Sequence, residues 1–140
     1  MAFTGNYSCN TLRSGLVNGT INFATDTFRL ALHTNAATLD QNTTAYTTDG
    51  EASGGDYSAG GQIVTATIGT ELASSGSIVY INFSAPSWTG AITARGALIY
   101  KAGANGAVCV LDFGSNKTST NTFTVTMPAN TSTSALIRLV

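Results

Sequence analysis

The sequence predicts an all-β protein, an antiparallel β-sandwich of about seven strands with one short N-terminal helix. Three observations support this fold class. Short apolar runs alternate with polar residues at a period of two. Threonine, which favours strands, is the most common residue, and turns rich in glycine and asparagine separate the runs at a spacing typical of sandwiches. With 140 residues and 43% hydrophobic content, the chain is expected to form a single domain over residues 1–140.

Residues 1–20 are expected to form an N-terminal arm that contains the short helix. Cys9, Leu12 and Leu16 recur at helical spacing. The candidate helix ends are Asn6 or Ser8 for the N-cap and Gly15 or Gly19 for the stop.

The first strand is expected at residues 28–33. Its alternating pattern sets Phe28, Leu30 and Leu32 against Arg29, Ala31 and His33. Because successive side chains of a strand point to opposite faces, the first set would face a core and the second would face solvent or a partner. His33, the single histidine, is therefore expected to be a surface histidine rather than a catalytic base.

Residues 35–62 show no strand pattern and are expected to form a long loop rich in glycine and threonine. A loop of this length in a compact domain is usually functional, so we expect an ordered excursion that carries Tyr46 and Tyr57. Its acidic residues are expected to form turns and keep the loop soluble, with a weak Ca²⁺ site as the alternative. These acids are Asp49, Glu51 and Asp56.

The remaining strands follow one another closely. They are expected at residues 63–68, 78–83, 93–100, 107–113, 122–127 and 135–139. Residues 78–81 are apolar on both faces, which is typical of a central strand. Asn105 and Gly106 form the dipeptide favoured in tight hairpins, so the strands on either side of them should pair.

Charge is unusually sparse in this chain. Lysine, arginine, aspartate and glutamate make up 9% of the residues, against about 25% in typical soluble domains, and the net charge is −1. Scattered basic residues argue against nucleic-acid binding, which needs clustered lysine and arginine. No apolar run approaches the ~20 residues of a membrane helix, so no membrane partner is expected. A nearly neutral surface favours self-association, which predicts a homo-oligomer or a surface covered by partners.

No catalytic, cofactor-binding or metal-ligating residues are predicted, and the chain is not expected to be an enzyme. The glycine-rich loop lacks the lysine of a phosphate-binding loop, no nucleophile elbow occurs, and one histidine with two distant cysteines does not make a zinc site. Cys109, which lies in an apolar stretch between Val108 and Val110, is expected to be a buried free thiol, with a disulfide to the distant Cys9 or a reactive thiol as the alternative. The start of the chain lacks the pattern of a secretory signal, which predicts a protein made and kept in a cytoplasm.

Four aromatic residues are the candidate interface residues. Tyr46, Tyr57 and Trp88 fall in predicted loops, where aromatic side chains anchor interfaces or stack on sugars, and Phe3 lies in the N-terminal segment. Anchoring of the loops to the core is the alternative interpretation of the loop aromatics.

Five segments carry a resemblance to known proteins, in order and over nearly the whole chain: Phe28–Asn35 (FRLALHTN), Thr43–Glu51 (TTAYTTDGE), Gly55–Gly61 (GDYSAGG), Ala94–Tyr100 (ARGALIY) and Val110–Gly114 (VLDFG). In these segments the chain resembles a family of small structural proteins encoded by tailed bacteriophages, including phages of cyanobacteria and other aquatic hosts. Cys9 and His33 depart from the aromatic and charged residues that the resemblance implies there.

The resemblance implies a virion component, assembled in the host cytoplasm. The expected role is a capsid decoration, or cement, protein whose partners are the major capsid protein and further copies of itself. A tail, collar or fibre subunit is one alternative. A glycan-binding module that attaches the particle to a host surface, with Tyr57 and Trp88 as platforms, is the other.

Overall fold

The computed structural model describes residues 3–73 and 76–139 and has an all-β fold with antiparallel sheets, as the sequence predicts. Within these residues there are ten strands, more than the seven expected, because several are only two or three residues long. The strands are β1 (Tyr7–Ser8), β2 (Phe28–His33), β3 (Gln62–Val64), β4 (Ala66–Ala73), β5 (Gly76–Phe83), β6 (Ser87–Thr89), β7 (Thr93–Lys101), β8 (Ala107–Thr118), β9 (Thr122–Thr124) and β10 (Ile137–Leu139), and the helix is α1 (Asn10–Asn18).

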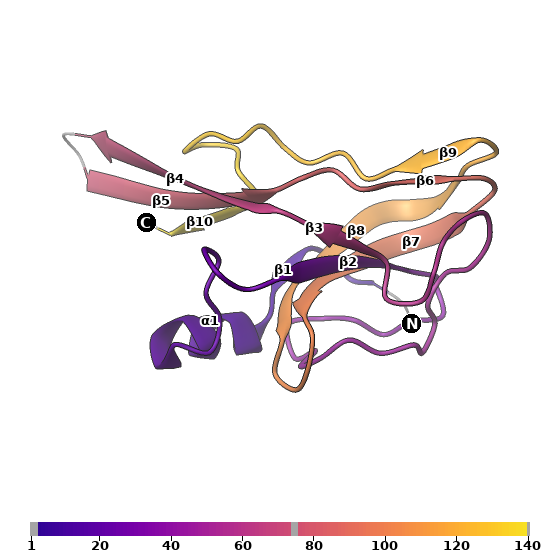
Figure 1. Ribbon diagram of the computed structural model, residues 1–140, viewed down its shortest axis with the longest axis horizontal. Helices are drawn as coiled ribbons and strands as arrows, with labels where there is room; N and C mark the ends of the chain where they lie inside the picture. The colour runs from indigo at the N-terminus through magenta and orange to yellow at the C-terminus, as the bar shows by residue number, and fades with distance from the viewer. Residues whose placement is uncertain (1–2, 74–75, 140) are drawn as a thin grey trace.

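The strands form two layers (Figure 1). One layer is a five-stranded sheet in the order β1-β8-β7-β2-β3. The other layer holds the three-stranded sheet β10-β5-β4 and the two-stranded sheet β6-β9. The main core lies between the layers and draws on both, with Phe28, Leu30 and Leu32 from β2 meeting Ile81 and Phe83 from β5.

The strand expected at residues 63–68 is two strands that belong to different sheets. β3 pairs with β2, and β4 pairs with β5 from Ala66 opposite Phe83 to Ala73 opposite Gly76. Thr65 lies between them, so the chain passes from one layer to the other at this residue. The local sequence alternates evenly through this point, which is why the pattern predicted one strand.

The observed ends of three strands differ from the predicted ends, in segments where at most one face of the strand is apolar. β8 continues five residues past Phe113 into a polar segment paired with β7, whereas β9 and β10 are shorter than their predicted runs. β1 and β6 were not predicted, because two or three residues are too few to show a period. The hairpin between β7 and β8 is confirmed, with Asn105 in the left-handed region at φ 59°.

Helix α1 begins after Cys9 and ends before Gly19, which has φ 81°. The stop at Gly19 was among those predicted, but the N-cap was wrong. The helix starts at Asn10, so Cys9 occupies the N-cap position and makes no side-chain cap hydrogen bond. Asn6 and Ser8 lie before it, where their side-chain oxygens accept the Asp112 N–H and Arg13. With nine residues, α1 is too short to cross a membrane, and no other helix occurs in the described part of the chain.

The prediction for His33 was wrong: the side chain is fully buried. Ala31 on the same face of β2 is also buried, because residues 34–61 fold across that face of the five-stranded sheet. This cover makes a second, smaller core in which Ala37 and Leu39 from the loop pack with Leu98 and other residues of the sheet. The alternation in β2 therefore separates two cores rather than a core from solvent.

Candidate functional site

The most distinctive region is the segment 34–61 that covers the five-stranded sheet, which we call the loop layer. It is ordered despite having only one bridge to a strand, between His33 and Glu51. Backbone hydrogen bonds close its first half into a large loop: Thr34 N–H donates to the Gly50 carbonyl over 2.7 Å, and Ala52 N–H donates to Leu32 over 2.9 Å. The excursion expected here is thus a fixed part of the fold.

Glu51 holds the loop layer together. One carboxylate oxygen accepts the Tyr46 hydroxyl over 2.7 Å, and the other accepts both the Tyr57 hydroxyl over 2.7 Å and the Gly60 N–H over 2.8 Å. The three donors come from both sides of Glu51 in the sequence. A single carboxylate therefore joins the middle of the loop layer to its end.

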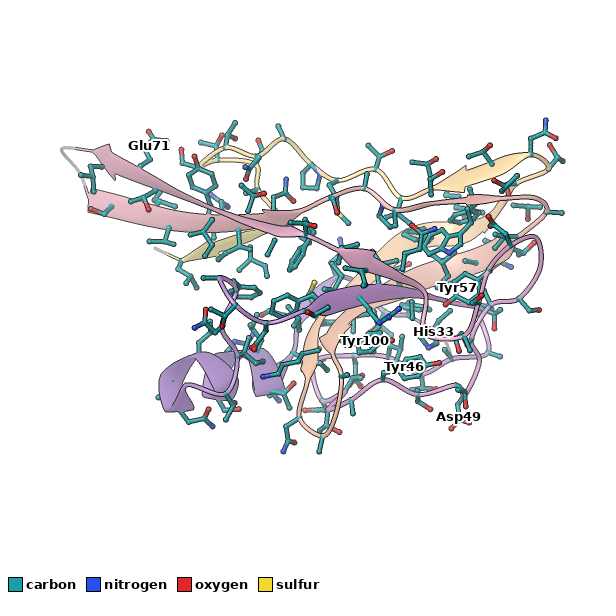
Figure 2. The ribbon with its side chains drawn as sticks, in the orientation of Figure 1. His33, Tyr46, Asp49, Tyr57, Glu71 and Tyr100 are labelled. Carbon is teal, nitrogen blue, oxygen red and sulfur yellow. The ribbon has the colours of Figure 1, made fainter. Side chains whose placement is uncertain are left out.

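The tyrosines connect this carboxylate to the sheet beneath. The Tyr57 hydroxyl accepts the Leu32 N–H of β2 over 2.9 Å. Tyr46 stacks on Tyr100 of β7 with ring centroids 4.8 Å apart, and the Tyr100 hydroxyl donates to the Gly60 carbonyl over 2.7 Å. Figure 2 shows Tyr46, Tyr57, Tyr100 and His33 gathered on this side of the molecule.

The electrostatics of the cluster suit a structural anchor. Burial, followed by the hydrogen bonds to Glu51, raises the pKa of Tyr46 and of Tyr57 well above the usual value near 10. Burial also raises the pKa of Tyr100. All three phenols therefore keep their protons and donate them in hydrogen bonds, and both oxygens of Glu51 are occupied as acceptors.

His33 lies beneath the same loop. Its Nε2 is 3.0 Å from the Thr47 carbonyl, and because a carbonyl only accepts, Nε2 carries the proton. Its buried Nδ1 has no hydrogen-bond partner. The histidine therefore holds the part of the loop layer that precedes Glu51, and its side chain is not exposed to a substrate.

The outer surface of the loop layer is made of small polar and glycine residues. Its exposed charged side chains are Asp49 and Asp56, and Asp40 is partly exposed. The Asp56 carboxylate accepts the Thr89 N–H over 2.7 Å. Beside the layer, a hollow of about 490 Å³ is lined by Arg29, Tyr46 and Tyr100 among others. The exposed residues of the layer are Asn35, Ala36, Thr38, Gln41, Asn42, Thr44, Thr48, Asp49, Ser53, Gly54, Gly55, Asp56, Ser58 and Ala59.

The four aromatic residues predicted as an interface do not lie together on the surface. Trp88 and Phe3 are 2% and 4% exposed, so neither offers a contact surface. Trp88 packs in the main core beside Tyr57, with ring centroids 5.4 Å apart, and Phe3 fills the second core. Tyr46 and Tyr57 are half-buried and engaged by Glu51. For these aromatics the structure supports the alternative interpretation, anchoring to the core.

Both cysteines are buried and unpaired, which confirms the prediction made for Cys109. Burial is the main reason that the pKa of Cys9 rises to about 12 and that the pKa of Cys109 is also raised. Neither thiol forms a nucleophilic thiolate near neutral pH. Within residues 3–73 and 76–139, no three histidine, cysteine or acidic side chains gather in a way that could hold a metal ion.

Glu51 is the residue that sequence reasoning missed, since its carboxylate was interpreted as a solubilising group. A weak signal was present: Glu51 stands alone between Tyr46 and Tyr57 in a segment otherwise rich in glycine and threonine. A long loop that lacks its own strands must be held by side chains, and an acid flanked by two tyrosines is a candidate for that role.

Comparison of the chain with protein-family models, with curated proteins and with solved structures finds no match. The resemblance to phage structural proteins therefore stays a prediction.

Proposed function

We propose that this protein is a structural component of a tailed-bacteriophage virion, and that it acts as a decoration protein bound to the major capsid shell. The resemblance of five segments supports the virion assignment. The observation that carries the binding role is the loop layer, a segment of 28 positions whose second half is joined by hydrogen bonds to the Glu51 carboxylate.

A fixed loop layer is suited to binding because the entropy of ordering it is lost during folding rather than during association. Its exposed side chains are short and almost all uncharged, so contact with a shell would desolvate few charges. Many copies would bind a repeating shell, and their summed free energy would oppose rupture by packaged DNA. The partners are the major capsid protein and further copies of this chain.

The first experiment counts this chain in purified particles by quantitative mass spectrometry, after separation of heads from tails. A copy number similar to that of the major shell subunit, found on heads, supports the decoration role. A few copies retained on tails would contradict it and favour a tail, collar or fibre subunit.

A second experiment places the contact. Thr48→Arg with Ser53→Arg introduces two charged side chains on the exposed surface of the loop layer, and Thr120→Arg introduces one on an exposed turn between β8 and β9. Binding to undecorated shells should weaken at least tenfold for the loop variant and stay unchanged for Thr120→Arg. Equal binding of the two variants would remove the loop layer from the contact.

The glycan-binding alternative loses the platforms predicted for it, because Trp88 is buried and Tyr57 is held by Glu51. What supports it is the hollow beside Tyr46, where Arg29 could accompany an aromatic ring. Binding of the purified chain to isolated host glycans, abolished by Arg29→Ala, would favour this role over decoration.

A further inference from the structure

The β4–β5 hairpin projects beyond the two-layer body, and its apolar face continues outside the core. Figure 1 shows the hairpin extending past α1 at one end of the molecule. The register places Ile68, Ile81 and Ile137 in one row across the sheet, on the face that packs into the core. Farther along the same face, Leu72 is 80% exposed and Leu139 is 45% exposed.

The opposite face of the hairpin is already covered. The Asn82 side chain donates to the Pro128 carbonyl over 2.6 Å, and Ser132 hydrogen-bonds to Glu71, so the segment that leads to β10 lies over this face. The inner face is therefore the apolar one, and it ends at β4. Figure 2 shows Glu71 at this end, far from the tyrosine cluster.

β4 is also a free edge. It lies at the end of the order β10-β5-β4, so its outer backbone groups have no strand partner among the described residues. Proteins usually protect such edges with lysine, proline or a bulge. β4 has none of these: its register with β5 is unbroken over eight residues, and its one charged residue is Glu71.

We infer that two copies of this chain pair through their β4 strands, antiparallel, about a two-fold axis at Thr70. A two-fold axis normal to the sheet keeps both inner faces on the same side, so directly opposed residues share a face. With the axis at Thr70, Ile68 of each copy lies opposite Leu72 of the other. The inner faces of the two copies then lie side by side across six strands, with an Ile68–Leu72 pair on either side of the central Thr70 pair.

Charge excludes the neighbouring register and favours this one. An axis at Glu71 would oppose the two carboxylates, which is destabilising. An axis at Thr70 instead places Glu71 opposite Gly69 of the other copy. The Tyr80 hydroxyl lies over Gly69, about 2.6 Å from where a Cβ on Gly69 would be, so each carboxylate meets a hydrogen-bond donor of the second copy.

The size of the contact points to a reversible dimer. Eight residues at about 3.3 Å each give an edge about 26 Å long. A standard interface buries about 800 Å² on each partner, more than such an edge provides without the apolar side chains beside it. Truncating or charging those side chains should therefore weaken the dimer strongly. This inference does not rest on the proposed function, because it concerns the purified chain alone.

Sedimentation velocity over a range of concentrations tests the dimer. The native chain should approach twice the 14.3 kDa of one copy as concentration rises. Leu72→Lys should raise the dissociation constant at least tenfold, and Tyr80→Phe should raise it by a smaller factor. Val17→Lys is the matched control, since Val17 is 90% exposed on α1, and it should dimerise like the native chain. Circular dichroism establishes that each variant is folded.

Cysteine crosslinking tests the register. Thr70→Cys lies on the proposed axis, so oxidation by glutathione disulfide should join the residue-70 thiols of the two copies. Leu72→Cys should not crosslink, because residue 72 lies opposite Ile68 of the second copy, four positions from that copy's residue 72. The two native cysteines are buried and do not compete. The dimer would be overturned by a native chain that stays monomeric, by a Leu72→Lys variant that still dimerises, or by assembly that grows beyond a dimer. The register would be overturned if Leu72→Cys crosslinks and Thr70→Cys does not.

Discussion

Replacing Glu51 with glutamine tests whether one carboxylate holds the loop layer. The amide keeps one oxygen acceptor for Tyr57 and Gly60, and its NH₂ group can donate to the Tyr46 hydroxyl, which accepts as well as donates, so the three hydrogen bonds persist without a charged partner. Hydrogen bonds to charged groups contribute about 1.5–3 kcal/mol each and neutral ones about 0.5–1.5 kcal/mol, a difference of about 1 kcal/mol for each of the bonds from Tyr46, Tyr57 and Gly60.

Part of this loss is offset, because the neutral amide no longer carries the desolvation penalty of a half-buried charge. We expect Glu51→Gln to lower the free energy of unfolding by about 2 kcal/mol. For a chain of this length, that corresponds to a fall in Tm of about 7 °C. Urea denaturation at pH 7, followed by circular dichroism, measures the difference.

Asp49→Asn is the matched control for Glu51→Gln. It removes the same charge two residues earlier, from an exposed side chain, and should change stability by less than about 0.5 kcal/mol. Equal effects of the two variants, or a Glu51→Gln variant as stable as the native chain, would refute the assignment of Glu51 as the anchor. Hydrogen exchange adds a local measurement: in Glu51→Gln the Gly60 amide should exchange faster, and amides of β5 should not.

Three further predictions follow from other parts of the chain. The hydrogen bond from Arg95 lowers the pKa of Asp112 below its ordinary value of 3.8. The pair therefore contributes to the free energy of unfolding above that pH, and this contribution is lost as the pH falls through the lower pKa of the folded state. Asp112→Asn should make acid unfolding less steep, and an unchanged profile would contradict this. The thiols of Cys9 and Cys109 should react with a thiol reagent at pH 8 only after denaturant is added, whereas prompt labelling of the folded chain would show that they are accessible. Trp88 should fluoresce at a shorter wavelength in the folded chain than in denaturant, with little quenching by iodide; strong quenching would place it at the surface instead.

The sequence predicted the strands that are long enough to show an alternating pattern. The alternation of Phe28, Leu30 and Leu32 was enough to place β2. The same pattern misled at His33, because a local period distinguishes two faces and cannot say what covers each of them. Only the tertiary fold of the loop layer shows that the polar-looking face of β2 is buried.

The site was less predictable than the fold for a similar reason. The partners of Glu51 are spread over residues 46–60, and Tyr100 joins them from a strand 40 positions past Gly60. No spacing rule relates an acid in a loop to a tyrosine in a distant strand. Sequence reasoning could locate the long loop and suggest that it is ordered, but not identify the residue that orders it.

The proposed loop-layer contact and the proposed dimer act at different places, so they can strengthen each other. The β4–β5 hairpin lies at one end of the molecule, and the loop layer covers the five-stranded sheet toward the other end (Figure 1). A dimer joined at β4 therefore keeps both loop layers free to bind. Two linked binding surfaces on one repeating shell raise the effective concentration of the second contact once the first has formed.

This combination predicts an order of affinities for undecorated shells. A Thr70→Cys dimer locked by its disulfide should bind the shells more tightly than the monomeric Leu72→Lys variant. Adding Thr48→Arg and Ser53→Arg to either variant should weaken its binding to the shells. If the locked dimer binds no more tightly than the monomer, the spacing of the two loop layers does not match the shell. The dimer would then belong to a step before the chain reaches the particle.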